Sequence, residues 1–324
     1  MSIMAQEERA ARAAHAAWPA LATRAGLSAV EWRPGPVRVR TVHGQTRVLL
    51  PLDGPMPLIL KHAPMESAVW LESQITAHRR AEAAFADAAG LHVPRLLAVD
   101  RERRAWLLER VPGRTAHDAM AGADGAGRLA ILTQAGRWAG HLHRAGPVQF
   151  RRIRSRPVLD RIARWREEIE AGSVKPSDTE RFDALRVQAM RMVEAAEGVK
   201  CTRTQIHGDL NLRNLILDLD HVWGIDFGTT ALRNPAVDLA RILVRHETFF
   251  GPVDGDAVET PEAARAALLA GYGGRWRDTT ALDHLIVVDL LRLWMSVPAQ
   301  PWRRSLTQAR RWAGISRMAA RLGV

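Results

Sequence analysis

The sequence has little cysteine and no long apolar run, and each shortage excludes a class of protein. Cys201 is the only cysteine, so a disulfide framework is excluded and a zinc site built on cysteine ligands is not expected. No stretch reaches the roughly 20 apolar residues that span a bilayer. The amino terminus has no basic segment followed by an apolar one, so we expect no secretory signal. The expected compartment is the cytoplasm.

Acidic residues are few relative to arginine, and lysine is nearly absent. The formal net charge is +11, and the only lysines are Lys61, Lys175 and Lys200. Such a charge either attracts phosphates, nucleic acid or an anionic membrane, or reflects an arginine-rich solvated surface. No basic block interleaved with aromatic residues and no zinc-finger spacing is present, so nucleic acid is not an expected partner. Peripheral membrane contact stays open, and the oligomeric state is not readable.

What is present is the composition of an ordinary globular protein. The chain has 324 residues, of which 47% are apolar and 25% charged, enough for two sub-domains with a sizeable core. We expect residues 1–112 to form an amino-terminal lobe with a leading helix, a five-stranded sheet and one further helix, and residues 113–324 to form a helical lobe. The patterns predict strands at 37–42, 47–50, 57–61, 94–100 and 105–111.

The most informative stretch of the chain runs from residue 206 to residue 228. It contains His207, Asp209 and Asn214 and, after a short polar break, Ile225-Asp226-Phe227-Gly228. Short apolar runs on both sides of that break predict a β-hairpin. The hairpin would bring two carboxylates and an amide to one end of a small sheet. Mg²⁺ prefers oxygen ligands and accepts substrate phosphates as the others.

The order of these motifs resembles a known superfamily. His-x-Asp-x₄-Asn followed by Ile-Asp-Phe-Gly is similar to the core of protein-kinase-like enzymes. Gly208 and the later segment 234–240, Asn-Pro-Ala-Val-Asp-Leu-Ala, narrow the resemblance to the aminoglycoside phosphotransferase and choline kinase branch. The resemblance implies a bilobal α+β fold, with a small antiparallel sheet lobe and a larger helical lobe. It also implies a phosphotransferase that uses ATP and Mg²⁺ on a hydroxyl of a small molecule.

The resemblance also implies roles in the catalytic loop. Asp209 would be the catalytic residue, which accepts the hydrogen bond and later the proton of the attacking hydroxyl. Asn214 and Asp226 would hold Mg²⁺. Two residues would support the loop by hydrogen bonds: His207 and Asp238.

On the nucleotide side the resemblance implies a lysine, a glutamate and a backbone segment. Lys61 ends an apolar run and would bind the α- and β-phosphates. Glu82 would orient Lys61, with Glu72 as the alternative. Backbone groups from Glu109 to Val111 would bind adenine.

Two segments depart from the usual pattern. The loop expected over the nucleotide, residues 42–46, lacks repeated glycines. In the catalytic loop Asn211 and Arg213 stand where many relatives carry a histidine and a glycine. Neutral Asn211 occupies the position of the protein-kinase lysine, which counts against a protein substrate. Two roles stay open for Arg213: contact with the γ-phosphate or an acidic substrate group, or a salt bridge to a neighbouring helix.

The acceptor site is expected in the carboxy-terminal helices, where arginine dominates. From Arg233 to Val324 there are thirteen arginines and no lysine against nine acids. This balance argues against a polycationic aminoglycoside and favours a neutral or anionic acceptor, such as a sugar or a phosphorylated metabolite. Two alternatives stay open: a sugar or lipopolysaccharide-core kinase near a membrane surface, and a nucleotide-binding pseudokinase. The sequence does not name the acceptor or separate ATP from GTP.

Overall fold

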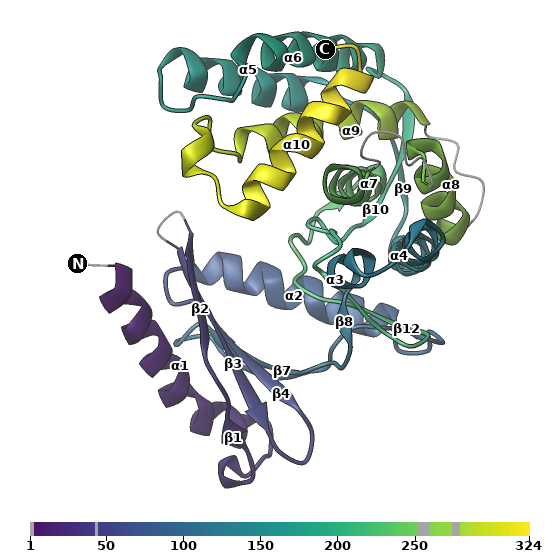
Figure 1. Ribbon diagram of the computed structural model, residues 1–324. Coiled ribbons are helices and arrows are strands. Elements are labelled where there is room, and N and C mark those ends of the chain that lie inside the picture. The colour runs from purple at the N-terminus through teal and green to yellow at the C-terminus, as the bar shows by residue number, and fades with distance from the viewer. Residues whose placement is uncertain (1–2, 43–44, 252–258, 274–278) are drawn as a thin grey trace. The chain divides into compact units, whose positions relative to one another are not determined.

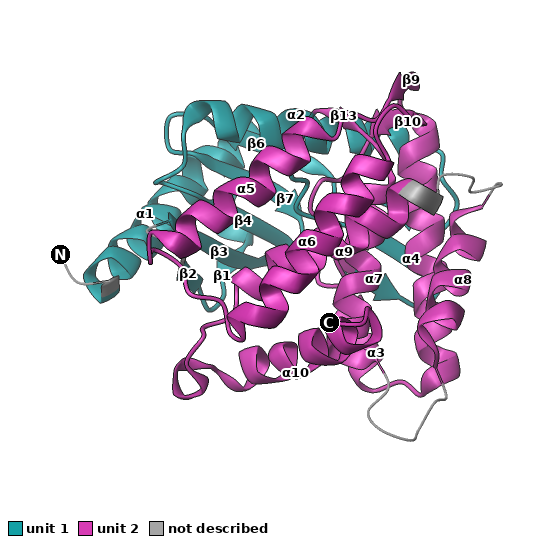
Figure 2. Ribbon diagram, turned by 90° about the horizontal axis from the view of Figure 1, so that it is seen from above, with its two compact units in different colours: residues 1–114, 216–230 teal, residues 115–215, 231–324 magenta. Residues whose placement is uncertain are grey.

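The computed structural model describes residues 3–42, 45–251, 259–273 and 279–324, which belong to two compact units (Figures 1 and 2). Unit 1 comprises residues 1–114 and 216–230, and unit 2 comprises residues 115–215 and 231–324. The hairpin segment 216–230 therefore belongs to unit 1, whereas a division at residue 112 assigns it to the helical lobe. Each unit has its own hydrophobic core.

Unit 1 is built on a six-stranded antiparallel sheet. Its strand order is β1-β3-β4-β7-β6, and β2 pairs with β3. Burial alternates along β3, where Val48, Leu50 and Leu52 point to the core, as expected for a strand with one face covered. The strands are β1 (Arg33–Pro34), β2 (Arg38–Val42), β3 (Gln45–Asp53), β4 (Leu58–His62), β6 (Leu96–Asp100) and β7 (Ala105–Glu109).

Two helices cover opposite faces of this sheet. Helix α1 (Ile3–Arg24) packs Trp18 and Leu21 into the core cluster that contains Leu107 of β7. Helix α2 (Ala68–Ala84) packs instead in the cluster that contains the neighbouring residue Trp106. Because successive side chains of a strand point to opposite faces, the two helices lie on different sides of the sheet.

A second, smaller sheet carries the predicted hairpin. Its order is β5-β12-β11-β8, with β5 (Leu91–His92) parallel to β12 (His221–Gly224). The other strands are β8 (Arg114–Thr115) and β11 (Leu215–Asp218). The turn between β11 and β12 is only two residues long, so the chain reverses at once and Asp226 follows the second strand by two residues.

Unit 2 is mainly helical, and α7 packs against α4, α8, α9 and α10. A short sheet of order β13-β10-β9 leads into the catalytic loop. The helices are α3 (Ala116–Ala121), α4 (Gly125–Ala145), α5 (Arg156–Glu170), α6 (Thr179–Ala195), α7 (Ala236–Phe250), α8 (Pro261–Tyr272), α9 (Thr279–Met295) and α10 (Leu306–Arg321). The strands are β9 (Gln149–Arg152), β10 (Lys200–Gln205) and β13 (Leu232–Arg233).

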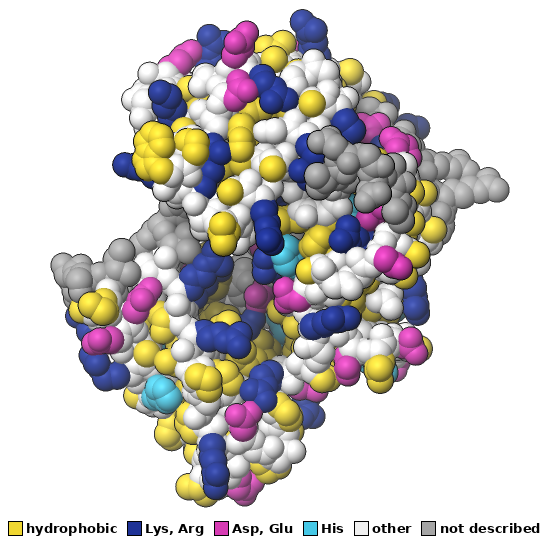
Figure 3. Space-filling model, in the orientation of Figure 1, with side chains coloured by type: hydrophobic (Ala, Val, Ile, Leu, Met, Phe, Trp, Pro, Cys, Tyr) yellow, Lys and Arg dark blue, Asp and Glu magenta, His cyan; other side chains and the backbone are white. Residues whose placement is uncertain are grey.

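Two observations bear on how the surface meets its surroundings. Lys and Arg side chains are scattered over the visible face with acidic ones among them, so the charge of +11 is not confined to one patch there (Figure 3). Across the ranges that the structure describes, no helix is both long and apolar enough to cross a membrane.

Candidate active site

The catalytic loop follows β10 and is anchored by one buried carboxylate. The backbone N–H groups of His207 and Gly208 donate hydrogen bonds to Asp238, over 2.7 and 3.0 Å. Gly208 has a φ of +83°, a conformation that costs glycine little and most other residues much more. Asp238 is fully buried in the first turn of α7. The start of this helix therefore fixes the start of the loop.

Asp238 is itself held by a histidine. The Nε2 atom of His143 lies 3.1 Å from Asp238 Oδ2, and its Nδ1 atom lies 3.2 Å from the hydroxyl of Tyr272. Burial alone would raise the pKa of Asp238, but the hydrogen bond and charge of His143, together with His207, outweigh burial and lower this pKa. His143 is thus a buried, hydrogen-bonded residue in the last turn of α4.

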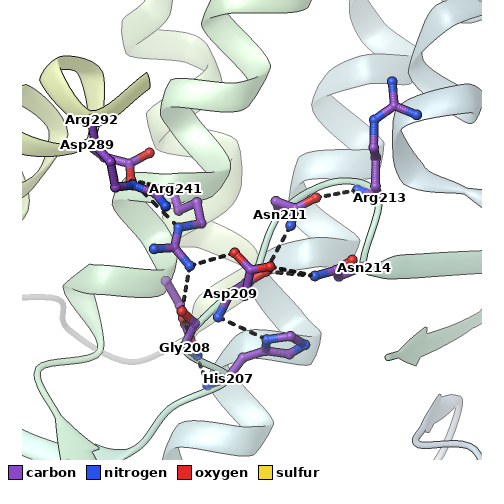
Figure 4. Close-up of polar contacts among 10 residues, drawn as sticks. His207, Gly208, Asp209, Asn211, Arg213, Asn214, Arg241, Asp289 and Arg292 are labelled. Atoms are coloured by element: carbon purple, nitrogen blue, oxygen red, sulfur yellow. Dashed lines mark hydrogen bonds and ion pairs between the residues drawn. The ribbon is translucent and has the colours of Figure 1, made fainter. Parts of the chain in front are cut away.

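Asp209 presents its carboxylate from this loop with about half of the side chain exposed (Figure 4). Arg241 donates from Nη1 to Asp209 Oδ1 over 2.9 Å and also binds the carbonyl oxygen of Gly208. His207 accepts a hydrogen bond from the Asp209 N–H at its Nδ1 atom, over 3.3 Å. His207 therefore holds the loop through both its backbone and its ring.

Asn214 closes the loop and keeps one amide atom for other use. Its Nδ2 atom donates to the carbonyl oxygen of Asp209 over 2.9 Å and lies 3.4 Å from Asp209 Oδ2. The nitrogen end of the amide is thereby committed to the loop, and the oxygen end points away from Asp209 (Figure 4). An amide oxygen in this position is a chemically suitable Mg²⁺ ligand.

Arg213 has a neutral partner on a neighbouring helix. Its Nη2 atom donates to Nε2 of His117 over 2.8 Å, and its backbone N–H donates to the side chain of Asn211. Burial and the charge of Arg213 lower the pKa of His117, which keeps the imidazole neutral and able to accept. The contact fits the helix-bridging option for Arg213, although with a hydrogen bond in place of a salt bridge.

In unit 1 the two predicted polar groups lie together. Lys61 of β4 binds Oδ1 of Asp226 through its ammonium group. Asp226 has a φ of +63°, in a region that few residues other than glycine occupy and that is often found at functional sites. The next residue, Phe227, is buried with its ring edge-on to His78 of α2. The carboxylate is half-exposed, and its oxygens suit a divalent cation.

The predicted glutamate partner of Lys61 has other contacts in this structure. Glu82 accepts a hydrogen bond from the backbone N–H of Leu96 over 3.4 Å. Burial raises the pKa of Glu82 more than this bond lowers it, which is the opposite of what a paired cation would do. The alternative, Glu72, binds Arg101 at the surface. The pairing of Lys61 with Glu82 therefore stays a prediction.

The remaining nucleotide residues lie at the end of β7. The backbone N–H of Glu109 donates to the carbonyl oxygen of Arg95 over 3.0 Å, so this group is occupied. Within the described ranges, no hydrogen bond of the Val111 N–H is found. The loop expected over the nucleotide at 42–46 includes residues 43–44, which lie outside the described residues.

The comparison with known families decides the identity of the fold and the chemistry. The model of the phosphotransferase enzyme family matches residues 38–285. The chain belongs to this family. It is a small-molecule kinase, and the predicted relationship to aminoglycoside phosphotransferases and choline kinases is confirmed. No curated protein matches the chain.

Solved structures agree with this phosphotransferase in fold. A glucosamine kinase in complex with glucosamine, ADP and inorganic phosphate is 16% identical, covers 89% of this chain and 81% of its own, and has a TM-score of 0.60. A choline/ethanolamine kinase family protein from Mesorhizobium loti is 15% identical, with 94% and 98% covered and a TM-score of 0.57. An aminoglycoside phosphotransferase from Streptomyces rimosus is 20% identical, with 90% and 99% covered and a TM-score of 0.52. The predicted α+β, kinase-like fold class is confirmed.

Three charged residues of this phosphotransferase site escaped the sequence analysis: Arg241, Asp289 and Arg292. Arg241 lies three residues after Asp238, so the two side chains share one face of α7. That spacing was the available signal. Asp289 and Arg292, on α9, lie far along the chain from the motif, and nothing local marks them.

Proposed function

We propose that this phosphotransferase uses ATP and Mg²⁺ to phosphorylate a hydroxyl of a small neutral or anionic molecule. The observation that carries the proposal is the half-exposed carboxylate of Asp209, which Arg241 and Asn214 hold from two sides (Figure 4). Phosphoryl transfer asks the protein chiefly to position groups and to balance charge. A fixed, accessible carboxylate is suited to both tasks.

Asp209 would accept the hydrogen bond of the acceptor hydroxyl and then its proton as the bond to phosphorus forms. Arg241 fixes one oxygen of the carboxylate, so the other can face the hydroxyl. Lys61 would bind the phosphates of the nucleotide, and Glu82 would orient it. When bound, Mg²⁺ would neutralise phosphate charge, and Asn214 and Asp226 offer the oxygen atoms that would hold it.

The adenine ring would meet the backbone after β7. The N–H of Glu109 is occupied by Arg95, which leaves its carbonyl oxygen and the Val111 N–H as the groups for the base. Arg213, bound to His117, would keep the catalytic loop against α3. An acceptor with a sugar-like ring agrees with the glucosamine kinase neighbour, whose similarity extends to the fold.

The test is release of ADP from ATP, and of GDP from GTP, with a panel of sugars, sugar acids, sugar phosphates and aminoglycosides. Asp209→Asn should lower kcat by about a hundredfold or more, because it removes the proton acceptor. The matched control is Asp220→Asn, in the exposed turn before β12, which should retain wild-type turnover. Full activity of Asp209→Asn would exclude the mechanism. Absence of transfer to every acceptor would favour the pseudokinase alternative.

One observation favours a second candidate, a kinase that works at a membrane surface. Trp302 and Leu306 are 82% and 85% exposed; Trp302 is followed by Arg303 in the turn before α10, and Leu306 is the first residue of α10. Apolar and basic side chains together suit an anionic bilayer surface. Salt-sensitive binding of the wild type to vesicles with anionic lipid, lost in Trp302→Ala, would support this candidate. Equal binding of the wild type and Trp302→Ala to the vesicles would exclude it.

A further inference from the structure

Arginine side chains from several elements of unit 2 gather beside the catalytic carboxylate. The charges of Arg241, Arg292 and Arg311 act on Arg245. The charges of Arg233, Arg241 and Arg292 act on Arg161. These residues come from α5, α7, α9, α10 and β13, so they are neighbours only in the folded chain. We call them the arginine cluster: Arg161, Arg233, Arg241, Arg245, Arg292 and Arg311.

The cluster has few carboxylates to balance it. Asp289 is shared, because its Oδ1 lies 2.9 Å from Nε of Arg292 and 3.6 Å from Nε of Arg241 (Figure 4). Asp289 is only 9% exposed, and its Oδ2 has no hydrogen-bond partner among the described residues. Arg241 also binds Asp209. Within the ranges that the structure describes, no ion pair of Arg161, Arg233 or Arg245 is found.

Among the described residues, Arg245 is the member of the cluster whose guanidinium group most lacks partners for its charge and its hydrogen bonds. Its Nη1 atom is buried and has no hydrogen-bond partner within the described part of the chain. Burial is the largest cause that lowers the pKa of Arg245 to about 10; the charges of nearby arginines act in the same direction, and Asp289 acts against them. The guanidinium is still charged at neutral pH. A buried, unmatched charge is costly, and an anion bound beside it would remove that cost.

We infer that the arginine cluster binds an anionic group of the acceptor, a carboxylate or a phosphate, with Arg245 and Arg292 as its direct ligands. The inference rests on the proposed function, because it assigns the acceptor of the same reaction. Guanidinium groups bind both anions through paired hydrogen bonds that an ammonium cannot reproduce. A polycationic acceptor would be repelled by the same charges.

The geometry also fixes what lies beside the anion. Arg241 contacts Asp209 through Nη1 and lies near Asp289 through Nε, so one side chain links the catalytic carboxylate to the cluster. The anionic group and the hydroxyl that is phosphorylated would thus belong to one compact molecule. Hydroxy acids, sugar acids and sugar phosphates have this form.

The experiment measures anion binding to the full-length protein by calorimetry, with ADP and Mg²⁺ present to fill the nucleotide site. The probes are gluconate, inorganic phosphate and neutral glucose. The variants are Arg245→Gln and Arg292→Gln, and the matched control is Arg310→Gln, which removes the same charge from an exposed position on α10. At least one of the two anions should bind the wild type. Both cluster variants should bind this anion at least about tenfold more weakly, and the control should bind it with wild-type affinity. Binding of gluconate would identify the anionic group as a carboxylate, and binding of inorganic phosphate would identify it as a phosphate.

Stability separates binding from folding. Arg245→Gln removes a partly buried charge whose Nη1 atom has no hydrogen-bond partner in the described part of the chain, so it should melt at the wild-type temperature or above while it loses the anion. Three results would overturn the inference: neither anion binds, Arg245→Gln and Arg310→Gln bind equally, or Arg245→Gln weakens ATP and neither anion. ADP release keeps the two proposals apart. If the enzyme phosphorylates only neutral or amine acceptors, and the cluster variants bind the anions as the wild type does, the anion site is excluded and the proposed kinase activity is retained. If the cluster variants bind an anion more weakly but no acceptor is phosphorylated, the proposed kinase activity is excluded and the anion site is retained.

Discussion

Lys61 in unit 1 and Arg241 in unit 2 each bind a carboxylate that the proposed reaction needs, but their surroundings differ. In unit 1 the charges have partners: the Lys61 ammonium binds Asp226, and the buried Asp100 forms ion pairs with Arg24 and Arg103. Around Arg241, by contrast, six arginines gather, and the ion pairs found there run from Arg241 to Asp209 and from Arg241 and Arg292 to Asp289.

This difference separates what is common to the reaction from what is particular to the acceptor. In the proposed function, Lys61 would leave Asp226 and bind the phosphates of a nucleotide, which is a partner common to many kinases. The arginine cluster has too few carboxylates to balance its positive charge, so in our proposal an anion from outside the chain supplies the balance. The sign of the imbalance therefore carries information about the acceptor that the paired residues do not.

The largest expected effect comes from breaking the ion pair between Lys61 and Asp226 in unit 1. Asp226→Asn should lower kcat by about a hundred- to a thousandfold, because it removes both the partner of Lys61 and a carboxylate for the metal. The measurement is steady-state ADP release at saturating ATP. Asp53→Asn, which breaks an exposed pair with Arg110 in the same unit, should leave turnover unaltered. A threefold loss or less in Asp226→Asn would contradict the assignment.

The next effect concerns the anchor of the catalytic loop. Asp238→Ala leaves two buried N–H groups and His143 without their acceptor, and should lower the free energy of unfolding by about 3–5 kcal/mol. Urea unfolding measures it. The control is Asp160→Ala, which breaks an exposed pair with Arg156 on α5 and should cost less than about 1 kcal/mol. Equal losses in the two variants would remove the anchoring role.

Arg241→Gln sharpens the comparison from the unmatched side. It removes the link between Asp209 and the cluster, and should lower kcat/KM by about tenfold or more through the lost charged hydrogen bond. Lys61 and the nucleotide side are unaltered, so the KM for ATP should stay within about twofold of wild type. An effect on ATP alone would place Arg241 with the nucleotide.

The smallest effect is on pH dependence. Burial lowers the pKa of His62 in unit 1 and of His117 in unit 2. Below pH 6.5 the unfolded chain takes up protons that these folded histidines refuse, so stability falls as pH drops through that value. Each contributes at most about 1.4 kcal/mol per pH unit. Urea unfolding at pH 7.5 and 5.5 should show the fall, and His117→Gln should reduce it. A stability that rises toward pH 5.5 would contradict these directions.

Local pattern explains which parts of this site were predictable. The hairpin, the loop from His207 to Asn214 and the position of Asp226 follow from residues close together in the sequence, and the structure has the hairpin where expected. Counting charges detected the arginine excess but not its place, because the cluster draws on helices more than a hundred residues apart. Whether Glu82 or Glu72 would pair with Lys61 was equally unpredictable, since this depends on how α2 lies against β4 and not on either segment alone.

Helix α7 carries Asp238, Arg241 and Arg245 at intervals of three and four residues, all on one face. Asp238 accepts hydrogen bonds from the loop, Arg241 binds the carboxylate of Asp209, and Arg245 would bind the proposed anion. One rigid rod thus sets the distance between reaction and recognition: four residues advance about 6 Å along a helix. The enzyme would select its acceptor by length as well as by charge, and a hydroxy acid with one carbon too many would present its hydroxyl out of register.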